Sequence, residues 1–266
     1  MKSLIRHGAT LVAVGGMVLG TLLGAGSRAI ALTQEQVVQQ LRHVPVFTIT
    51  DEEGAPLVSE VPDREDIAPV ARVFISRSDA QAFLDNLRAN NPDLGEAVQV
   101  TPVSLARVYE VAVAGQDPEN RLEFVFVPMA DQVESAVNVL QEERIEGGGE
   151  LLEEGEFSGV PLFTARVAGE GEEGGGYLTI EVGEQQVIPL FFTQEELQSL
   201  LDRIGASQPD LAATLSPHII RLEDLIHTLE ASDNADLQQI QLIPPQESID
   251  FIREATSGQP EGQPEE

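Results

Sequence analysis

The sequence predicts an α/β fold of the mixed α+β type, built from two copies of one unit that are related by a pseudo-twofold axis. Residues 73–94 recur at residues 190–211 without a gap, and Val44–Thr48 return as Val160–Thr164. A repeat of this length is a duplicated half-domain and not a solenoid. Within each copy, segments with strand and helix periodicity alternate, which favours mixed β-strands with about three helices packed against them.

Each copy begins with a pair of strands. In the first copy a short helix precedes them, because Thr33–Gln36 form a capping-box pattern before a short apolar run. Residues 44–50 then alternate with β-branched side chains, and Asp51–Gly54 predict a turn. Residues 160–167 repeat the strand in the second copy. The longer turn of Glu and Gly at 169–176 is expected to be an exposed hairpin tip.

A strand and a long amphipathic helix follow. Residues 71–75 predict the strand, and Ser76 or Ser78 is the expected N-cap of the helix. In the second copy Thr193–Glu196 form a capping-box pattern. Both helices are expected to end at Pro-Asp-Leu sequences that begin at Pro92 and Pro209. Their apolar positions share the spacing i, i+3, i+4, i+7: Ala80, Phe83, Leu84 and Leu87 in the first copy, and Leu197, Leu200, Leu201 and Ile204 in the second.

A second helix, a strand and a third helix complete each copy. The strands are predicted at residues 122–127 and 239–243, and Pro128 and Pro244 end them. The third helices are predicted around residues 133–140 and 249–252. The second helices repeat one apolar pattern: Leu105, Val108, Tyr109 and Ala112 match Leu222, Leu225, Ile226 and Leu229.

The predicted organisation has four parts. Residues 1–31 carry basic residues, an apolar stretch and a small-residue cleavage pattern, which predicts a secretory signal peptide; an uncleaved anchor is the alternative. The first repeat half covers 32–144 and the second covers 145–256. The glutamate- and glycine-rich join is either a linker or a long surface loop between interleaved halves. Residues 257–266 lack apolar anchors and predict a disordered acidic tail.

The net charge limits the classes of partner. Without residues 1–31, 12 basic and 45 acidic residues leave a formal net charge of −33, and none of the basic residues is a lysine. Nucleic acid phosphates and anionic lipid surfaces repel such a chain. After signal cleavage we expect no direct membrane insertion and no nucleic acid partner. Basic segments of other proteins are the favoured partners.

The residue types argue against an enzyme. The chain contains no cysteine, so disulfides, thiolate metal sites and cysteine nucleophiles are excluded. The three histidines beyond the signal peptide, His43, His218 and His227, lack metal-site spacing, and we expect a helix cap for His43 and solvated roles for the others. Paired glutamates are too frequent to mark an acid–base pair. We therefore predict no catalytic residues, no metal site and no cofactor.

The doubled apolar stripes have two interpretations. The first is core packing, which is the ordinary role of such a stripe. The second is a set of partly exposed grooves in which an unfolded or extended segment lies, surrounded by acidic side chains. On the second interpretation the client-binding residues are these eight: Phe47, Phe83, Leu84, Leu87, Phe163, Leu197, Leu200 and Leu201.

The order of these elements resembles a known family, the soluble 22-kDa component of the chloroplast inner-envelope translocon (Tic) and its cyanobacterial relatives. The resemblance rests on Val44–Phe47, on Val73–Ser76 leading to Phe83–Leu84, on Val103–Tyr109 and on Phe126–Pro128, each with its second-copy partner. No single motif is specific, but their order in a secreted, duplicated chain is. The resemblance covers nearly the whole mature chain.

The resemblance implies a function that the residues alone do not. It implies a chaperone or escort for unfolded or precursor proteins, including outer-membrane barrel proteins and their assembly machinery, in envelope protein transport and outer-membrane biogenesis. The signal peptide favours the cyanobacterial periplasm, with the thylakoid lumen as the alternative. Two other hypotheses stay open: a structural or adaptor subunit of an envelope translocation complex, and an enzyme or small-ligand binder.

Overall fold

The structure is a computed structural model of the chain, and it describes residues 32–59, 68–115, 122–146, 157–168, 176–232 and 234–257. The predicted signal peptide, most of the predicted join, most of the glycine-rich hairpin tip and residues 258–266 of the predicted tail lie outside these described residues. Among the described residues, none of the helices combines the length and apolar character that crossing a membrane requires.

The first copy contains five strands and five helices in the described residues. Its capping box is formed as predicted: the Thr33 side chain accepts from the Gln36 amide, and the Gln36 side chain accepts from the Thr33 amide. The predicted turn forms around Gly54, whose positive φ of 86° suits glycine. In chain order the elements are α1 (Gln34–Leu41), β1 (Pro45–Thr50), β2 (Val58–Ser59), β3 (Val70–Phe74), α2 (Arg77–Asn90), α3 (Pro92–Glu96), β4 (Gln99–Ser104), α4 (Leu105–Ala114), β5 (Glu123–Val127) and α5 (Ala130–Glu146).

The second copy repeats this order without a counterpart of α1 among the described residues. Its helix after the third strand begins differently from the prediction, because the Thr193 side chain donates to the Glu196 carboxylate (2.8 Å) instead of capping the helix. In chain order the elements are β6 (Pro161–Val167), β7 (Ile180–Val182), β8 (Gln185–Phe191), α6 (Gln194–Ser207), α7 (Pro209–Ala212), β9 (Leu215–Arg221), α8 (Leu222–Ala231), the 3₁₀ helix η2 (Ala235–Gln239), β10 (Ile240–Ile243) and α9 (Gln246–Ser257).

The two sheets have the same topology. The strand order is β5-β3-β1-β4 in one and β10-β8-β6-β9 in the other, and each also holds a short extra strand, β2 or β7. In both sheets the first pair is parallel and the next two are antiparallel. The register also repeats, since Phe47 lies opposite Phe74 and Phe163 lies opposite Phe191. The predicted mixed α/β fold is confirmed at this level.

Two strands, two short α-helices and the 3₁₀ helix η2 were not predicted. The missed strands, β4 and β9, contain Pro102 and Pro217, and proline argues against a central strand because it cannot donate to the ladder. Both strands lie at the edge of their sheet, where this missing donor is tolerated. The missed helices, α3 and α7, begin at the prolines that end the long helices, with proline in the first turn.

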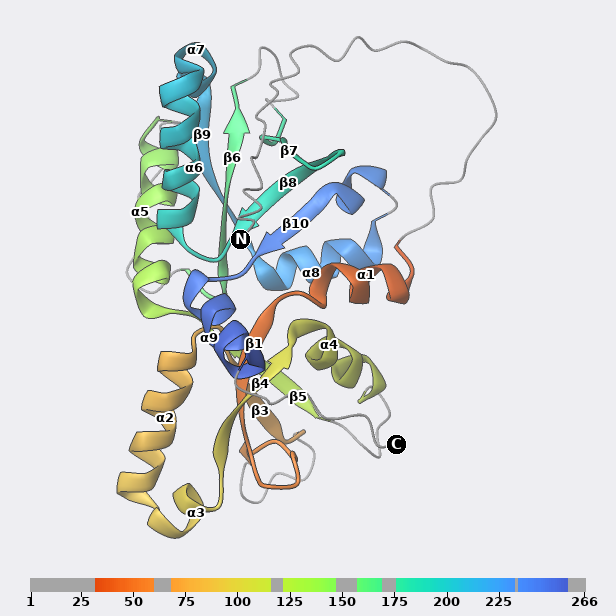
Figure 1. Cartoon of the computed structure of the whole chain (residues 1–266), viewed down its shortest axis with the longest axis vertical. Coiled ribbons are helices and arrows are strands. Elements are labelled where there is room, and N and C mark those ends of the chain that lie inside the picture. The colour runs from red at the N-terminus through yellow and green to blue at the C-terminus, as the bar shows by residue number, and fades with distance from the viewer. Residues whose placement is uncertain are drawn as a thin grey trace, which may run out of the picture.

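The third helix of each copy packs on the sheet of the other copy. Helix α5 contacts β6, β9 and α6 of the second copy, whereas α9 contacts β1 of the first. The Phe251 ring of α9 lies edge-on to Phe47, with ring centroids 5.8 Å apart. Figure 1 shows α5 alongside α6, and α9 next to β1. The copies are therefore interleaved, and the predicted boundary after residue 144 falls within the last turn of α5.

One central hydrophobic cluster joins the two copies. Helix α1 contacts both α4 and α8, and these three helices lie stacked on one side of the molecule in Figure 1. Buried members of the cluster come from both copies, among them Val46 and Leu105 from the first and Leu162 and Leu222 from the second. The largest cluster of buried apolar residues in the described part of the chain is thus shared between the copies.

Four helix N-termini meet where the copies join, on the other side of the molecule. The Ser76 hydroxyl at the start of α2 donates to Glu247 of α9 (3.0 Å), and the Gln246 amide donates to Glu196 of α6 (3.1 Å). The buried Gln132 of α5 accepts from the first amide of α6 (2.8 Å). Acceptor side chains here satisfy amides that a helix start leaves unpaired, and the carboxylates oppose the positive ends of the helix dipoles.

This junction is expected to make stability depend on pH. Burial, together with the Asp131 and Glu247 carboxylates, raises the pKa of Asp79, and burial also raises the pKa of Glu196. A carboxyl group with a raised native pKa favours the native state below its unfolded pKa, and this contribution is lost as the pH rises through the raised value. We therefore expect the melting temperature to fall as the pH rises from the unfolded pKa of these carboxyl groups through their raised native pKa.

Asp79→Asn is expected to flatten that fall, measured as melting temperature against pH. The matched control is Glu134→Gln, which removes the same charge from an exposed position on α5. Equal slopes in the two variants would show that the general acidity of the chain, and not the junction, sets the pH dependence.

Candidate functional site

Five of the eight predicted client-binding side chains lie in the core. Their side chains are at most 4% exposed and pack against the inner faces of the sheets or helices: Phe47, Leu84, Phe163, Leu197 and Leu200. Burial of this degree leaves no surface for a client in this structure. For these residues the core-packing interpretation of the stripes describes what the side chains do.

Phe83 and Leu87 are partly exposed and line a hollow of about 230 Å³ near β2 and α3. The Arg72 guanidinium lies over the Phe83 ring, 5.1 Å from its centroid, and Phe74 packs beside it at 5.4 Å. A cation held on the ring face covers part of the aromatic surface. Leu201 is also partly buried and packs against the cluster beneath α6. These three residues present only small apolar surfaces.

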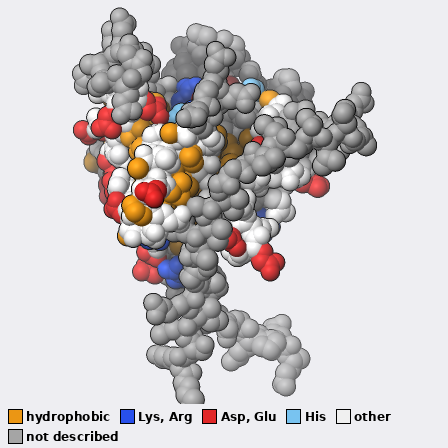
Figure 2. Space-filling view, turned by 90° about the horizontal axis from the view of Figure 1, so that it is seen from above, with side chains coloured by type: hydrophobic (Ala, Val, Ile, Leu, Met, Phe, Trp, Pro, Cys, Tyr) orange, Lys and Arg blue, Asp and Glu red, His pale blue; other side chains and the backbone are white. Residues whose placement is uncertain are grey.

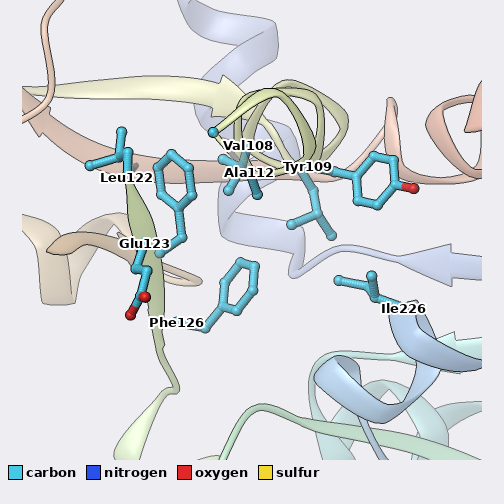
Figure 3. A pocket seen from close by; sticks show the side chains of 10 residues that line it. Val108, Tyr109, Ala112, Leu122, Glu123, Phe126 and Ile226 are labelled. Carbon is cyan, nitrogen blue, oxygen red and sulfur yellow. The ribbon is translucent and has the colours of Figure 1, made fainter. Parts of the chain in front are cut away.

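A more open apolar pocket lies elsewhere, between α4, β5 and α8. We call it the α4–β5 pocket, and its volume is about 460 Å³. Figure 3 shows Phe126 of β5 and Ile226 of α8 extending toward one another across it, below α4. Among the described residues, the lining is apolar apart from one carboxylate and one phenol: Leu105, Val108, Tyr109, Ala112, Gly115, Leu122, Glu123, Phe124, Phe126 and Ile226.

The local sequence explains why this pocket forms. Helix α4 starts directly after β4, where the Ser104 side chain accepts from the Arg107 amide (3.1 Å) and the Leu105 amide donates to Val44 (2.8 Å). Alternate residues of a strand share a face, so Phe124 and Phe126 both point to the α4 side. The small Ala112 on the opposite wall leaves the space between helix and strand unfilled.

Tyr109 connects the wall of the pocket to α8. Its phenol donates to the Glu230 carboxylate, and burial together with this carboxylate raises the pKa of Tyr109 to about 12. The hydroxyl points away from the apolar space in Figure 3. The pair therefore links α4 to α8, the two helices that border the pocket.

Tyr109→Phe is expected to cost about 1 kcal/mol of unfolding free energy near neutral pH, because one hydrogen bond to a carboxylate is lost. The raised pKa stabilises the native state below the ordinary phenol value of 10.0, and this contribution disappears as the pH rises toward about 12. The difference between the parent protein and the variant should therefore shrink over that range.

Urea unfolding at several pH values checks this, and Glu230→Gln serves as the matched variant at the other end of the hydrogen bond. Absorbance titration in a Tyr177→Phe background isolates the Tyr109 phenol, since the chain has two tyrosines. An ordinary phenol titration near pH 10 would contradict the contact.

Two further pockets of about 390 Å³ each lie at equivalent positions on the sheet edges. One lies between β4 and α9 and includes Pro102, Ile249 and Ile252; the other lies between β9 and α5 and includes Leu140 and Ile219. Each is bordered by the exchanged third helix. Apolar side chains also gather among acidic ones on the end of the molecule that carries α6 and α7, viewed from above in Figure 2.

Two of the three described histidines, His43 and His218, make side-chain contacts. His218, expected to be solvated, is 24% exposed and lies 3.0 Å from Glu143, so it ties β9 to the exchanged helix α5. The Arg42 side chain donates to His43 (2.9 Å) at the end of α1, and His227 is exposed. Among the described residues, no three His, Asp or Glu side chains converge in a way that would hold a metal ion.

Sequence reasoning missed the α4–β5 pocket, although it identified α4 and β5. One signal was available: Phe124 and Phe126 are aromatic, whereas the matching residues of the second copy, Ile240 and Leu242, are aliphatic. Whether an apolar residue faces a filled or an open space depends on the element packed above it, and periodicity does not report that.

The sequence matches the Tic22-like family over residues 13–254. It is 22% identical over 246 residues to Protein TIC 22, chloroplastic, of Pisum sativum, which covers 90% of this chain and 86% of that protein. Protein TIC 22-like, chloroplastic, of Arabidopsis thaliana is 25% identical over 219 residues, or 80% of this chain and 62% of that protein.

Solved structures agree with the sequence match. Anabaena Tic22, described as a protein-transport protein, aligns with a TM-score of 0.71 and 27% identity, covering 87% of this chain and 100% of that chain. Tic22 from Plasmodium falciparum aligns with a TM-score of 0.60 and 19% identity, covering 84% and 99%, a likeness of fold alone. Because the family match covers residues 13–254, nearly the whole chain, the chain belongs to the Tic22-like family.

Proposed function

We propose that this chain is a non-enzymatic chaperone that escorts unfolded or precursor proteins in envelope protein transport and outer-membrane biogenesis. The observation that carries the proposal is the α4–β5 pocket, an apolar space left open in a strongly acidic protein. The description of the Anabaena relative as a protein-transport protein supports it, as do relatives named after the chloroplast Tic components.

The geometry suits weak, reversible binding of apolar side chains. A pocket of this volume takes one or two large side chains of a client, and each buried apolar side chain contributes about 1.5–3 kcal/mol. Such contacts are released again when the client folds or is handed on. Negative charge over the rest of the surface attracts basic segments and opposes association between two copies of the carrier.

The proposed compartment is the periplasm, with the thylakoid lumen as the alternative. The signal-peptide pattern of residues 1–31 supports export, and the chloroplastic relatives support an envelope role. The proposed clients are precursor proteins, including outer-membrane barrel proteins before their assembly machinery receives them.

Suppression of aggregation by the mature protein tests the proposal. The protein from Leu32 onward is mixed at sub-stoichiometric to equimolar ratios with an unfolded outer-membrane barrel protein that is diluted from denaturant, and light scattering is followed. We expect suppression by the parent protein and a marked loss in Ala112→Trp, because the indole fills the pocket without removing a packed side chain.

The matched control is Ala114→Trp, which places the same residue on the same helix at an exposed position outside the pocket. It should suppress aggregation as the parent does. Absence of suppression with several clients would overturn the chaperone proposal and favour the adaptor-subunit hypothesis. Equal loss in both variants would move the binding surface away from this pocket.

A further inference from the structure

Helix α1 packs on a surface that is the counterpart, in the other copy, of the α4–β5 pocket. We call this surface the α1 seat. The pocket is bordered by α4, β5 and Ile226 of α8. Because α4 corresponds to α8 and β5 to β10 in the repeat, its counterpart is bordered by α8, β10 and α4. Helix α1 contacts these same three elements. One copy of the site is thus filled by a helix, and the other is open.

The way α1 is held shows what this kind of site accepts. Val37 and Leu41 are 1% and 0% exposed in the central cluster, and Val38 packs beside them. The Gln40 side-chain amide donates to the Leu237 carbonyl (2.6 Å), while the other face of the helix is solvated. The seat therefore binds two turns of an amphipathic helix through an apolar stripe.

Matching residues of the two copies differ in exposure, depending on whether a helix covers them. Beneath α1, Leu229 is 0% and Leu242 is 6% exposed. Their counterparts in the open pocket, Ala112 and Phe126, remain partly exposed. Equivalent positions are thus covered by a helix in one copy and leave apolar surface exposed in the other, and exposed apolar surface of this kind marks an interaction site.

The chain's own counterpart of α1 is a poor occupant. With the offset that aligns Val44 with Val160, the residues at the positions of Val37 and Val38 are Glu153 and Glu154. Placing two carboxylates in an apolar pocket is costly, so this segment lacks the stripe that α1 uses. A partner must supply it.

We infer that the α4–β5 pocket binds a short amphipathic helix of a client protein, seated as α1 is seated, with a basic polar face. The inference rests on the proposed function and specifies the conformation and charge of the bound segment. The basic face follows from Glu123 in the pocket wall and from the strongly negative net charge of the chain. On the bordering helices Glu230 contacts Tyr109, and Glu110 pairs with Arg107 (3.7 Å).

A peptide derived from α1 is the probe. It carries residues 33–43, and three of the exposed residues, Gln34, Glu35 and Gln39, are changed to arginine. Its control has Val38→Pro in addition, which keeps most of the apolar surface and the charge but breaks a helix. Fluorescence anisotropy measures binding of each peptide to the full mature protein, and circular dichroism reports helix formation, since an isolated peptide of this length is mostly unstructured.

We expect the first peptide to bind and become helical, the proline peptide to bind at least about tenfold more weakly, and salt to weaken binding. Ala112→Trp should weaken binding by at least about tenfold, whereas Ala114→Trp should leave it unchanged. Equal binding of the proline peptide would overturn the inference and indicate an extended segment.

The remaining outcomes separate this inference from the proposed function. Aggregation suppression that depends on Ala112, without binding of either peptide, would overturn the helix inference and leave the chaperone proposal intact. Binding of the helical peptide without suppression of aggregation would overturn the chaperone proposal and leave the helix inference intact. If the Leu151→Ser, Leu152→Ser variant bound the peptide more strongly, residues 147–156 would be the occupant of the pocket. If sedimentation showed a dimer that Ala112→Trp abolishes, the occupant would be a second copy of the chain. Either result would overturn the inference.

Discussion

Fragments that contain residues 32–144 or 145–257 are expected not to fold when they are made separately. Alone, the first fragment lacks α9, so Phe47 loses the Phe251 ring that covers it, and the second lacks α5, which covers Phe163 and β9. Both also lose half of the central cluster. A half-domain that exposes this much apolar surface cannot offset its conformational entropy.

Circular dichroism and urea unfolding of each fragment measure this. We expect no cooperative transition in either fragment alone and a single transition when the two are refolded together, because the exchanged helices then find their sheets. A cooperative transition in the lone first fragment would mean that the predicted boundary at residue 144 separates two independent domains.

Phe47→Ala and Phe163→Ala are each expected to cost about 3–5 kcal/mol of unfolding free energy, which is the range for truncating a fully buried phenylalanine. Both side chains are 0% exposed and occupy equivalent positions in the two sheets. Phe83→Ala is the matched control, because that ring is partly exposed on α2 and should cost about 1–2 kcal/mol.

Urea unfolding of each variant gives the free energy of unfolding from the transition midpoint and slope. The slope should be the same in the variants and the parent protein. The same three variants also decide between the two interpretations of the apolar stripes. If Phe47→Ala left stability unchanged but abolished aggregation suppression, the side chain would belong to a client-binding surface. A large stability loss, with suppression retained under conditions where the variant is still folded, would support the core interpretation.

Much of the fold could be predicted from local patterns. The capping box at Thr33, the helix periodicity around Leu84 and Leu200, and the stops at Pro92 and Pro209 all correspond to observed elements. These signals involve residues within a few positions of each other, so no knowledge of distant contacts is needed. The edge strands β4 and β9 were not predicted, because Pro102 and Pro217 within them are residues that argue against a strand.

The candidate site could be predicted less well, for a physical reason. The stripe residues Phe47 and Phe163 and the pocket residue Phe126 all read as apolar positions of amphipathic elements. Their exposure differs because distant segments cover the first two, α9 and α5 respectively, and leave the third partly open. Burial is a property of what packs on a residue, and that is decided by contacts across the whole chain.

The repeat pattern, the order of most elements, the acidity and the lack of cysteine can be read from the sequence alone, because they depend on composition and local spacing. The exchange of the third helices, and the packing of α1 over one site while its counterpart stays open, follow from contacts between distant parts of the chain. The same amphipathic pattern lowers the free energy equally well against either sheet. Which sheet a helix covers is therefore settled by the packing of the two copies together.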